Sequence, residues 1–183
     1  MTAAINHVLE IVGGNGLSGI RGTADNLHDV LVNAGAFPVE LLIDDRLAVV
    51  ANLRRQGLVE LAHDGDELRV QPSVKGIHRL QRAQVAGLKI TSPTRWDGLW
   101  RMVSYDIPAR HGKQRRLFVT ELHRLGFTML GDSLWFHPYP CVDVLSSLIA
   151  YCGLSDYVLV AEVARLDENS SRRLHRAHPD MQR

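Results

Sequence analysis

The stretch that decides the fold is Trp96–Pro140, WDGLWRMVSYDIPARHGKQRRLFVTELHRLGFTMLGDSLWFHPYP. Its first part predicts a strand that ends before Pro108, because proline cannot donate the next hydrogen bond of a sheet. Gly126 suits the end of the helix that follows, and Gly131-Asp132 separates two short apolar runs as a hairpin turn does. The stretch therefore predicts a strand, a helix and two further strands.

A helix over Cys141–Cys152 and a strand over Tyr157–Val163 extend this pattern to βαββαβ, which is the ferredoxin-like arrangement. Residues 96–166 are thus expected to form a ferredoxin-like domain. Both faces of its predicted sheet carry apolar side chains, but two helices can cover only one face. We therefore expect a homodimer through the free sheet face, with packing against the first domain of the same chain as the alternative.

Residues 1–88 predict three helices and then a two-stranded hairpin, which is the order of a winged helix-turn-helix domain. Thr23 suits the cap of the second helix, and Asp44 the cap of a third helix over Asp44–Gln56. The fold class is therefore α+β, with a winged helix-turn-helix domain before the ferredoxin-like one. Residues 89–95 form the linker, and the polar residues 167–183 are expected to be a flexible tail.

The third helix of a winged helix-turn-helix lies in the major groove of double-stranded DNA. We expect Asn52, Arg55 and Gln56 to face outwards, where Asn and Gln can bind adenine and Arg can bind guanine. The cations expected to help hold the phosphates are Arg21, Arg46, Arg54, Arg55 and those of the basic helix from Lys75 to Arg82. The inner side of the helix would carry its apolar residues, Leu47, Val50, Ala51 and Leu53.

The same polar residues could instead only solvate an exposed helix face. Asp44 and Asp45 stand at the start of this helix, where a phosphate would approach, and the expected tip of the hairpin is also acidic. Acidic groups repel DNA. A module that contacts protein rather than DNA is therefore a further alternative.

Asp106 stands at the end of the strand predicted over residues 99–107. Its carboxylate could hold a Mg²⁺ ion, and dimer symmetry could bring two copies together for phosphodiester hydrolysis. The structural alternative is that Asp106 pairs with Arg115 or caps the following helix. We expect no catalytic residue and no cofactor apart from such a magnesium ion, since phosphate-binding loops, nucleophile motifs and histidine ligand sets are all missing from the sequence. If the chain is an enzyme, it would be a magnesium-dependent endonuclease.

The composition is that of a globular protein: 183 residues, 45% hydrophobic and 22% charged, with a net charge of +1. This charge argues against nucleic-acid binding through bulk charge alone. Cys141 and Cys152 share a helical stripe with Leu145 and Leu148, so buried thiols are favoured over a disulfide. No secretory signal or membrane-spanning run occurs in the sequence, which predicts a cytoplasmic protein without a membrane partner.

The segments WDGLWRMVSYDIP, LGF and SLWFHPYP resemble the central region of the phenylacetate-catabolism repressor (PaaX-like) family of transcriptional regulators. That region is similar to the small ferredoxin-like subunit of CRISPR adaptation complexes, in which Tyr105-Asp106-Ile107 has a counterpart. DRLAVVANLRRQGLVE, residues 45–60, resembles the recognition helix of the repressors. The resemblance spans about residues 23–166. It implies a dimeric DNA-binding repressor, and the CRISPR likeness implies the alternative of a metal-dependent nuclease or scaffold that uses Asp106.

Overall fold

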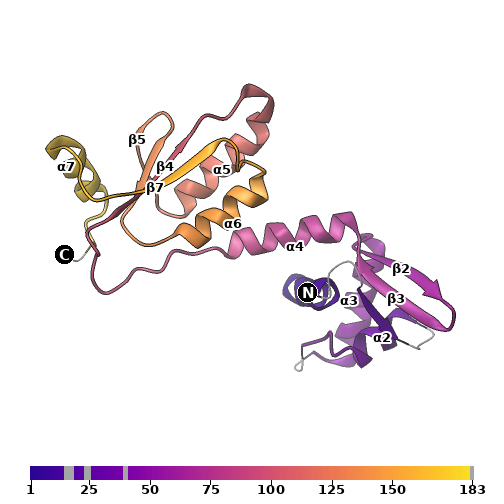
Figure 1. Cartoon of the computed structure of the whole chain (residues 1–183). Coiled ribbons are helices and arrows are strands. Elements are labelled where there is room, and N and C mark those ends of the chain that lie inside the picture. The colour runs from indigo at the N-terminus through magenta and orange to yellow at the C-terminus, as the bar shows by residue number, and fades with distance from the viewer. Residues whose placement is uncertain (15–18, 23–25, 39–40, 182–183) are drawn as a thin grey trace. The chain divides into compact units, whose positions relative to one another are not determined.

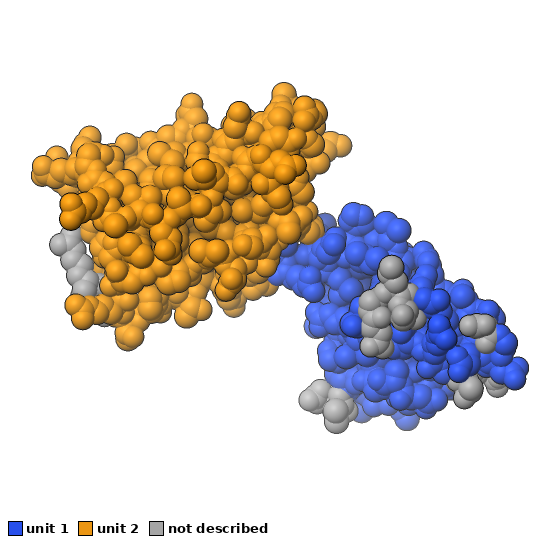
Figure 2. Space-filling view, viewed as in Figure 1, with its two compact units in different colours: residues 1–86 blue, residues 87–183 orange. Residues whose placement is uncertain are grey.

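The structure is a computed structural model, which describes residues 1–14, 19–22, 26–38 and 41–181. It divides into two compact units, residues 1–86 and residues 87–183 (Figure 2). Each unit combines helices with an antiparallel sheet, so the fold class is α+β as predicted. Among the described residues, no helix is long and apolar enough to cross a membrane.

The first unit builds a three-stranded sheet with helices packed against it. Its strand order is β1-β3-β2, and all pairs are antiparallel. The elements in chain order are α1 (Thr2–Gly14), β1 (Ile20–Gly22), α2 (Leu27–Asn33), α3 (Ile43–Arg55), β2 (Val59–Asp64), β3 (Glu67–Pro72) and α4 (Val74–Gly87) (Figure 1).

The short strand β1 has no signal in the sequence, and its pairing depends on Gly19. This glycine has a φ of 60°, and a Cβ atom there would collide with the carbonyl oxygen of Val70 on β3. The close approach lets Ile20 pair with Val70, both of which are buried. The third strand therefore arises from tertiary packing rather than from a local pattern.

Two helix caps differ from the expectation. The second helix is capped by Asn26, whose side-chain oxygen accepts a hydrogen bond from the Asp29 amide at 3.1 Å. The expected cap, Thr23, lies outside the described residues. The third helix begins at Ile43, one residue before Asp44, so Asp44 lies in the first turn instead of at the cap. A carboxylate in that turn still interacts favourably with the amides of the helix N-terminus.

The second unit has the predicted order of strand, helix, two strands, helix and strand. Its four-stranded antiparallel sheet has the order β5-β6-β4-β7. Its elements are β4 (Trp100–Tyr105), the 3-10 turn η2 (Ala109–His111), α5 (Gly112–Arg124), β5 (Thr128–Gly131), β6 (Leu134–His137), α6 (Val142–Cys152), β7 (Val158–Val163) and α7 (Glu168–Ala177).

Helices α5 and α6 cover one face of this sheet, and α7 lies on the opposite side (Figure 1). Phe118 of α5 packs edge-on against Tyr105 of β4, with ring centroids 5.9 Å apart. Cys141, the N-cap of α6, and Cys152, its last residue, are buried and form no disulfide, which confirms the prediction. Burial raises the pKa of the Cys141 thiol to about 12 and that of Cys152 to about 11.

The polar C-terminal segment was expected to be a flexible tail, but residues 168–177 form the helix α7. Asp167 caps the helix by accepting hydrogen bonds from the amides of Asn169 and Ser170. Leu174 is fully buried in a cluster with Trp100 of β4 and Phe136 of β6. Met181 is buried in the same cluster, and the His175 ring lies against the rings of Trp96 and Trp100, so several contacts hold the segment on the sheet. Part of the sheet face left for a second copy is therefore covered by the chain itself.

Candidate nucleic-acid interface

Helix α3 is turned relative to the orientation expected from its sequence. Val49 and Leu53 are fully buried, whereas Leu47 is 50% exposed and Ala51 is also exposed. Leu47 and Ala51 were thus wrongly placed on the inner side. The run Leu47 to Ala51 is continuously apolar, so the helical period fits two stripes equally well. Packing selects the stripe that contains Val49.

Asn52 and Gln56, expected to read bases, are half-buried and belong to a hydrogen-bond network within the first unit. Asn52 Oδ1 accepts from Arg55 at 2.7 Å and from Gln56 at 2.9 Å. Arg79 of α4 donates to Gln56 Oε1 at 3.1 Å and to Asn6 of α1 at 2.9 Å. The network joins α3 to α4 and α1, so these two side chains hold the unit together.

Arg46 also makes internal contacts. Its Nε donates to the carbonyl of Leu41 at 2.9 Å, and its guanidinium lies 5.8 Å from the centre of the Phe37 ring. The side chain is half-buried and fixes the segment that precedes α3. It is therefore less available for a phosphate than the sequence suggested.

Two arginines at the end of α3, Arg54 and Arg55, are exposed. Arg54 was among the cations expected to hold phosphates, and it lies on the exposed side of the helix. Lys75 is exposed near the start of α4. The Ser73 hydroxyl holds that start against the end of α3, because it donates to the carbonyl of Gly57 at 2.6 Å. The structure thus brings cations together where α3 ends and α4 begins.

The beginning of α3 has the opposite character. Asp44 and Asp45 are exposed in its first turn, beside the exposed apolar side chains of Leu42 and Ile43. The hairpin of β2 and β3 turns at Gly65–Asp66, where Asp66 is exposed. A phosphate is therefore repelled at the start of α3 and attracted at its end.

Asp106 fits neither structural alternative. It is exposed, and its backbone amide donates to the carbonyl of Tyr157 at 2.9 Å. The turn η2 separates it from α5, whose N-cap is His111. Among the residues that the structure describes, Arg115 forms no ion pair with Asp106, and its guanidinium lies 5.7 Å from the centre of the Tyr105 ring instead.

A second carboxylate, Asp156, lines the same surface hollow as Asp106, at the ends of β4 and β7. The hollow has a volume of about 610 Å³ and is also lined by Ser104, Ser133 and Tyr157. Asp156 was missed because only the pairing of β4 with β7 brings it close. Within the described residues, no group of three or more His, Cys, Asp or Glu side chains is arranged to hold a metal ion.

Residues 93–175 match the family described as the PaaX protein central Cas2-like domain. The second unit belongs to the PaaX central Cas2-like domain family. The resemblance of WDGLWRMVSYDIP, LGF and SLWFHPYP to the PaaX central region is thereby confirmed. The matched region includes β4 and most of α7. Helix α7 is therefore part of the matched domain.

The match does not extend to residues 1–92, so the first unit has no family assignment from it. No curated protein matches the chain.

Proposed function

We propose that the chain is a DNA-binding transcriptional regulator that acts as a repressor. The observation that carries this proposal is the PaaX central Cas2-like domain in residues 93–175. In this proposal the first unit is a winged helix-turn-helix domain that binds double-stranded DNA. The second unit is a ferredoxin-like domain that brings two copies together.

The topology of each unit supports this assignment. In the first unit, α2 and α3 are followed by the hairpin of β2 and β3, and β1 completes a small sheet, as in a winged helix-turn-helix. In the second, numbering its strands 1 to 4 along the chain gives the order 2-3-1-4, with all pairs antiparallel, which is typical of a ferredoxin-like sheet.

The charges favour the C-terminal end of α3 as the main DNA contact. Arg54, Arg55 and Lys75 are exposed there, and the acidic first turn would lie away from the phosphates. Asn52, Gln56 and Arg46 stay candidates for DNA binding, but each must first give up or share an internal hydrogen bond. Arg55 also donates one hydrogen bond to Asn52, but it is exposed and has further donors, so it is the residue best placed to bind a guanine.

Selection of bound sequences from a pool of random DNA duplexes by the purified chain tests the proposal. We expect a recurrent sequence to be enriched, and we expect Arg55→Ala to weaken its binding by about 1–3 kcal/mol. Arg172→Ala, an exposed arginine on α7, is the matched control and should change specific binding much less. Failure to enrich any sequence would count against the regulator and in favour of a protein-binding role for the apolar start of α3.

The second candidate function is a magnesium-dependent nuclease, or a scaffold of the CRISPR adaptation type. It is favoured by one observation, the presence of Asp106 and Asp156 in a single hollow, because two carboxylates can bind one Mg²⁺ ion. Incubation of labelled RNA and DNA with the chain and MgCl₂ tests this. Cleavage that persists unchanged in Asp106→Ala would remove Asp106 from any such mechanism.

A further inference from the structure

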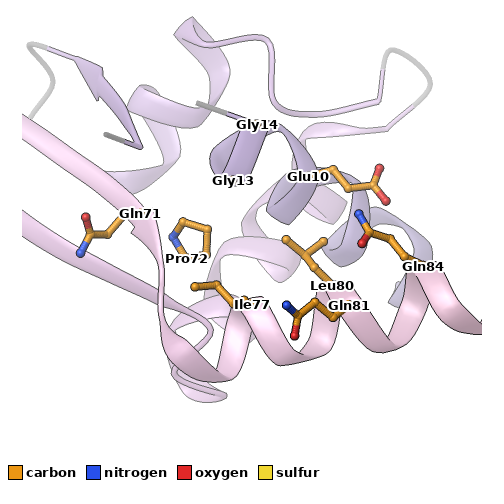
Figure 3. A pocket seen from close by; sticks show the side chains of 9 residues that line it. All are labelled: Glu10, Gly13, Gly14, Gln71, Pro72, Ile77, Leu80, Gln81 and Gln84. Carbon is orange, nitrogen blue, oxygen red and sulfur yellow. The ribbon is translucent and has the colours of Figure 1, made fainter. Parts of the chain in front are cut away.

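The first unit contains a hollow of about 490 Å³ between the end of α1, the end of β3 and one side of α4 (Figure 3). This volume lies in the range of sites that hold small organic molecules. The hollow exists because α1 ends in two glycines, Gly13 and Gly14, which carry no side chain to fill it. A Cβ atom at Gly13 would already lie 3.4 Å from the side chains of Leu80 and Pro72.

The floor of the hollow is apolar. Pro72 at the end of β3 and Ile77 and Leu80 of α4 provide it, and Ile77 is 39% exposed. An exposed apolar surface that is concave can bury much of a small ligand, and removing this surface from water favours binding. The floor therefore suits the apolar body of a ligand.

The rim is polar and negatively charged. Gln81 and Gln84 of α4 offer amide groups, and the Glu10 carboxylate of α1 lies on the same side as Gln84 in Figure 3. Glu10 is the one charged side chain among the described residues that line the hollow. An anion would be repelled here, while an ammonium group would gain a partner and amide oxygens that accept hydrogen bonds.

We propose that this hollow binds a small organic amine with an apolar body. The body lies on Pro72, Ile77 and Leu80, and the ammonium group is held by Glu10 and the amides of Gln81 and Gln84. Binding of the amine does not rest on the proposed function.

Titration of the full chain, without DNA, with three indoles of matched size tests the site by NMR. Tryptamine is a cation, tryptophol is neutral and indole-3-propionate is an anion. We expect tryptamine to shift the side-chain amide signals of Gln81 and Gln84. Its affinity should exceed that of tryptophol by a factor of about three or more. Indole-3-propionate should bind most weakly.

Two variants separate this site from non-specific binding. Ile77→Trp should fill the hollow and weaken tryptamine binding by about tenfold or more, since it removes the space for the ring. Val74→Trp is the matched control, because Val74 is a 69% exposed residue of the same helix and does not line the hollow. Glu10→Gln should abolish the preference for tryptamine over tryptophol.

The proposal is overturned if the Gln81 and Gln84 signals do not move, if indole-3-propionate binds as tightly as tryptamine, or if both tryptophan variants weaken binding equally. Since DNA is absent from this titration, the result is independent of whether the chain is a regulator.

Discussion

His137 illustrates how one buried side chain couples the stability of the second unit to pH. It lies against the Phe127 ring, and its Nδ1 accepts a hydrogen bond from the Tyr139 amide at 3.1 Å. Burial is the main cause that lowers the His137 pKa to about 4, and His178 and Arg101 lower it further. His137 is therefore neutral in the folded protein at pH 7.

The unfolded chain takes up a proton on this histidine near pH 6.5, well before the folded chain does. The stabilisation by neutral His137 is thus complete above pH 6.5 and is lost as the pH falls towards 4. We expect the free energy of unfolding to fall by about 2 kcal/mol between pH 7 and pH 5 from this group. Urea unfolding at the two pH values measures it. His137→Asn should reduce the difference, and an unchanged difference would contradict the assignment.

At the scale of elements, α3 shows which features the sequence could predict and which it could not. Its existence and its end at Gly57 follow from local signals. Local signals do not show which face of the helix is buried, because its central apolar run fits two stripes. The exposure of Leu47 and Ala51 and the half-burial of Asn52 were missed for this one reason.

The orientation of α3 predicts opposite outcomes for two neighbouring substitutions. Val49→Ala should destabilise the chain by about 2 kcal/mol, since it leaves a cavity at a fully buried position. Leu47→Ala removes a larger side chain from a position that is 50% exposed, so we expect it to cost less than about 0.5 kcal/mol. Thermal unfolding of the two variants measures the difference. A larger loss of stability in Leu47→Ala than in Val49→Ala would show that Leu47, not Val49, is the buried residue.

Helix α7 is a second element, and its packing on the sheet can be tested at one buried residue. Leu174→Ala should weaken the packing of α7 on the sheet by about 2–3 kcal/mol, because Leu174 is fully buried beside Trp100. The tryptophan emission should then shift to longer wavelength as water reaches Trp100, with Arg172→Ala as the exposed control on the same helix. An unshifted spectrum would show that α7 stays in place without this anchor.

At the scale of the whole molecule, the strand pattern and the motif around Asp106 predicted the second unit well. Pro108 ends a strand because it has no amide hydrogen to donate, and Gly126 ends a helix because glycine adopts a positive φ, here 86°, without strain. Strand β1, the anchoring of α7 and the approach of Asp156 to Asp106 depend on contacts between distant segments. Such contacts leave no periodic signal, so the sequence could not predict them.

The sheet face of the second unit also bears on assembly. Leu159 of β7 pairs with Ser104 and is 56% exposed on the face that α7 covers only in part. We expect the chain to sediment as a dimer, and we expect Leu159→Glu to give a monomer, because it places a charge in the apolar contact. Leu117→Glu, on the exposed side of α5, is the control and should stay dimeric. A wild-type monomer would contradict dimerisation through this face.

We expect the cations at the end of α3 and the start of α4 to hold DNA phosphates. The most direct measurement is the dependence of duplex affinity on salt concentration. It compares the wild-type chain with the double variant Arg54→Gln/Lys75→Gln. We predict that the logarithmic slope falls by about 2 in the double variant, one for each lost phosphate contact. An unchanged slope, or no salt-sensitive binding by the wild type, would contradict the account.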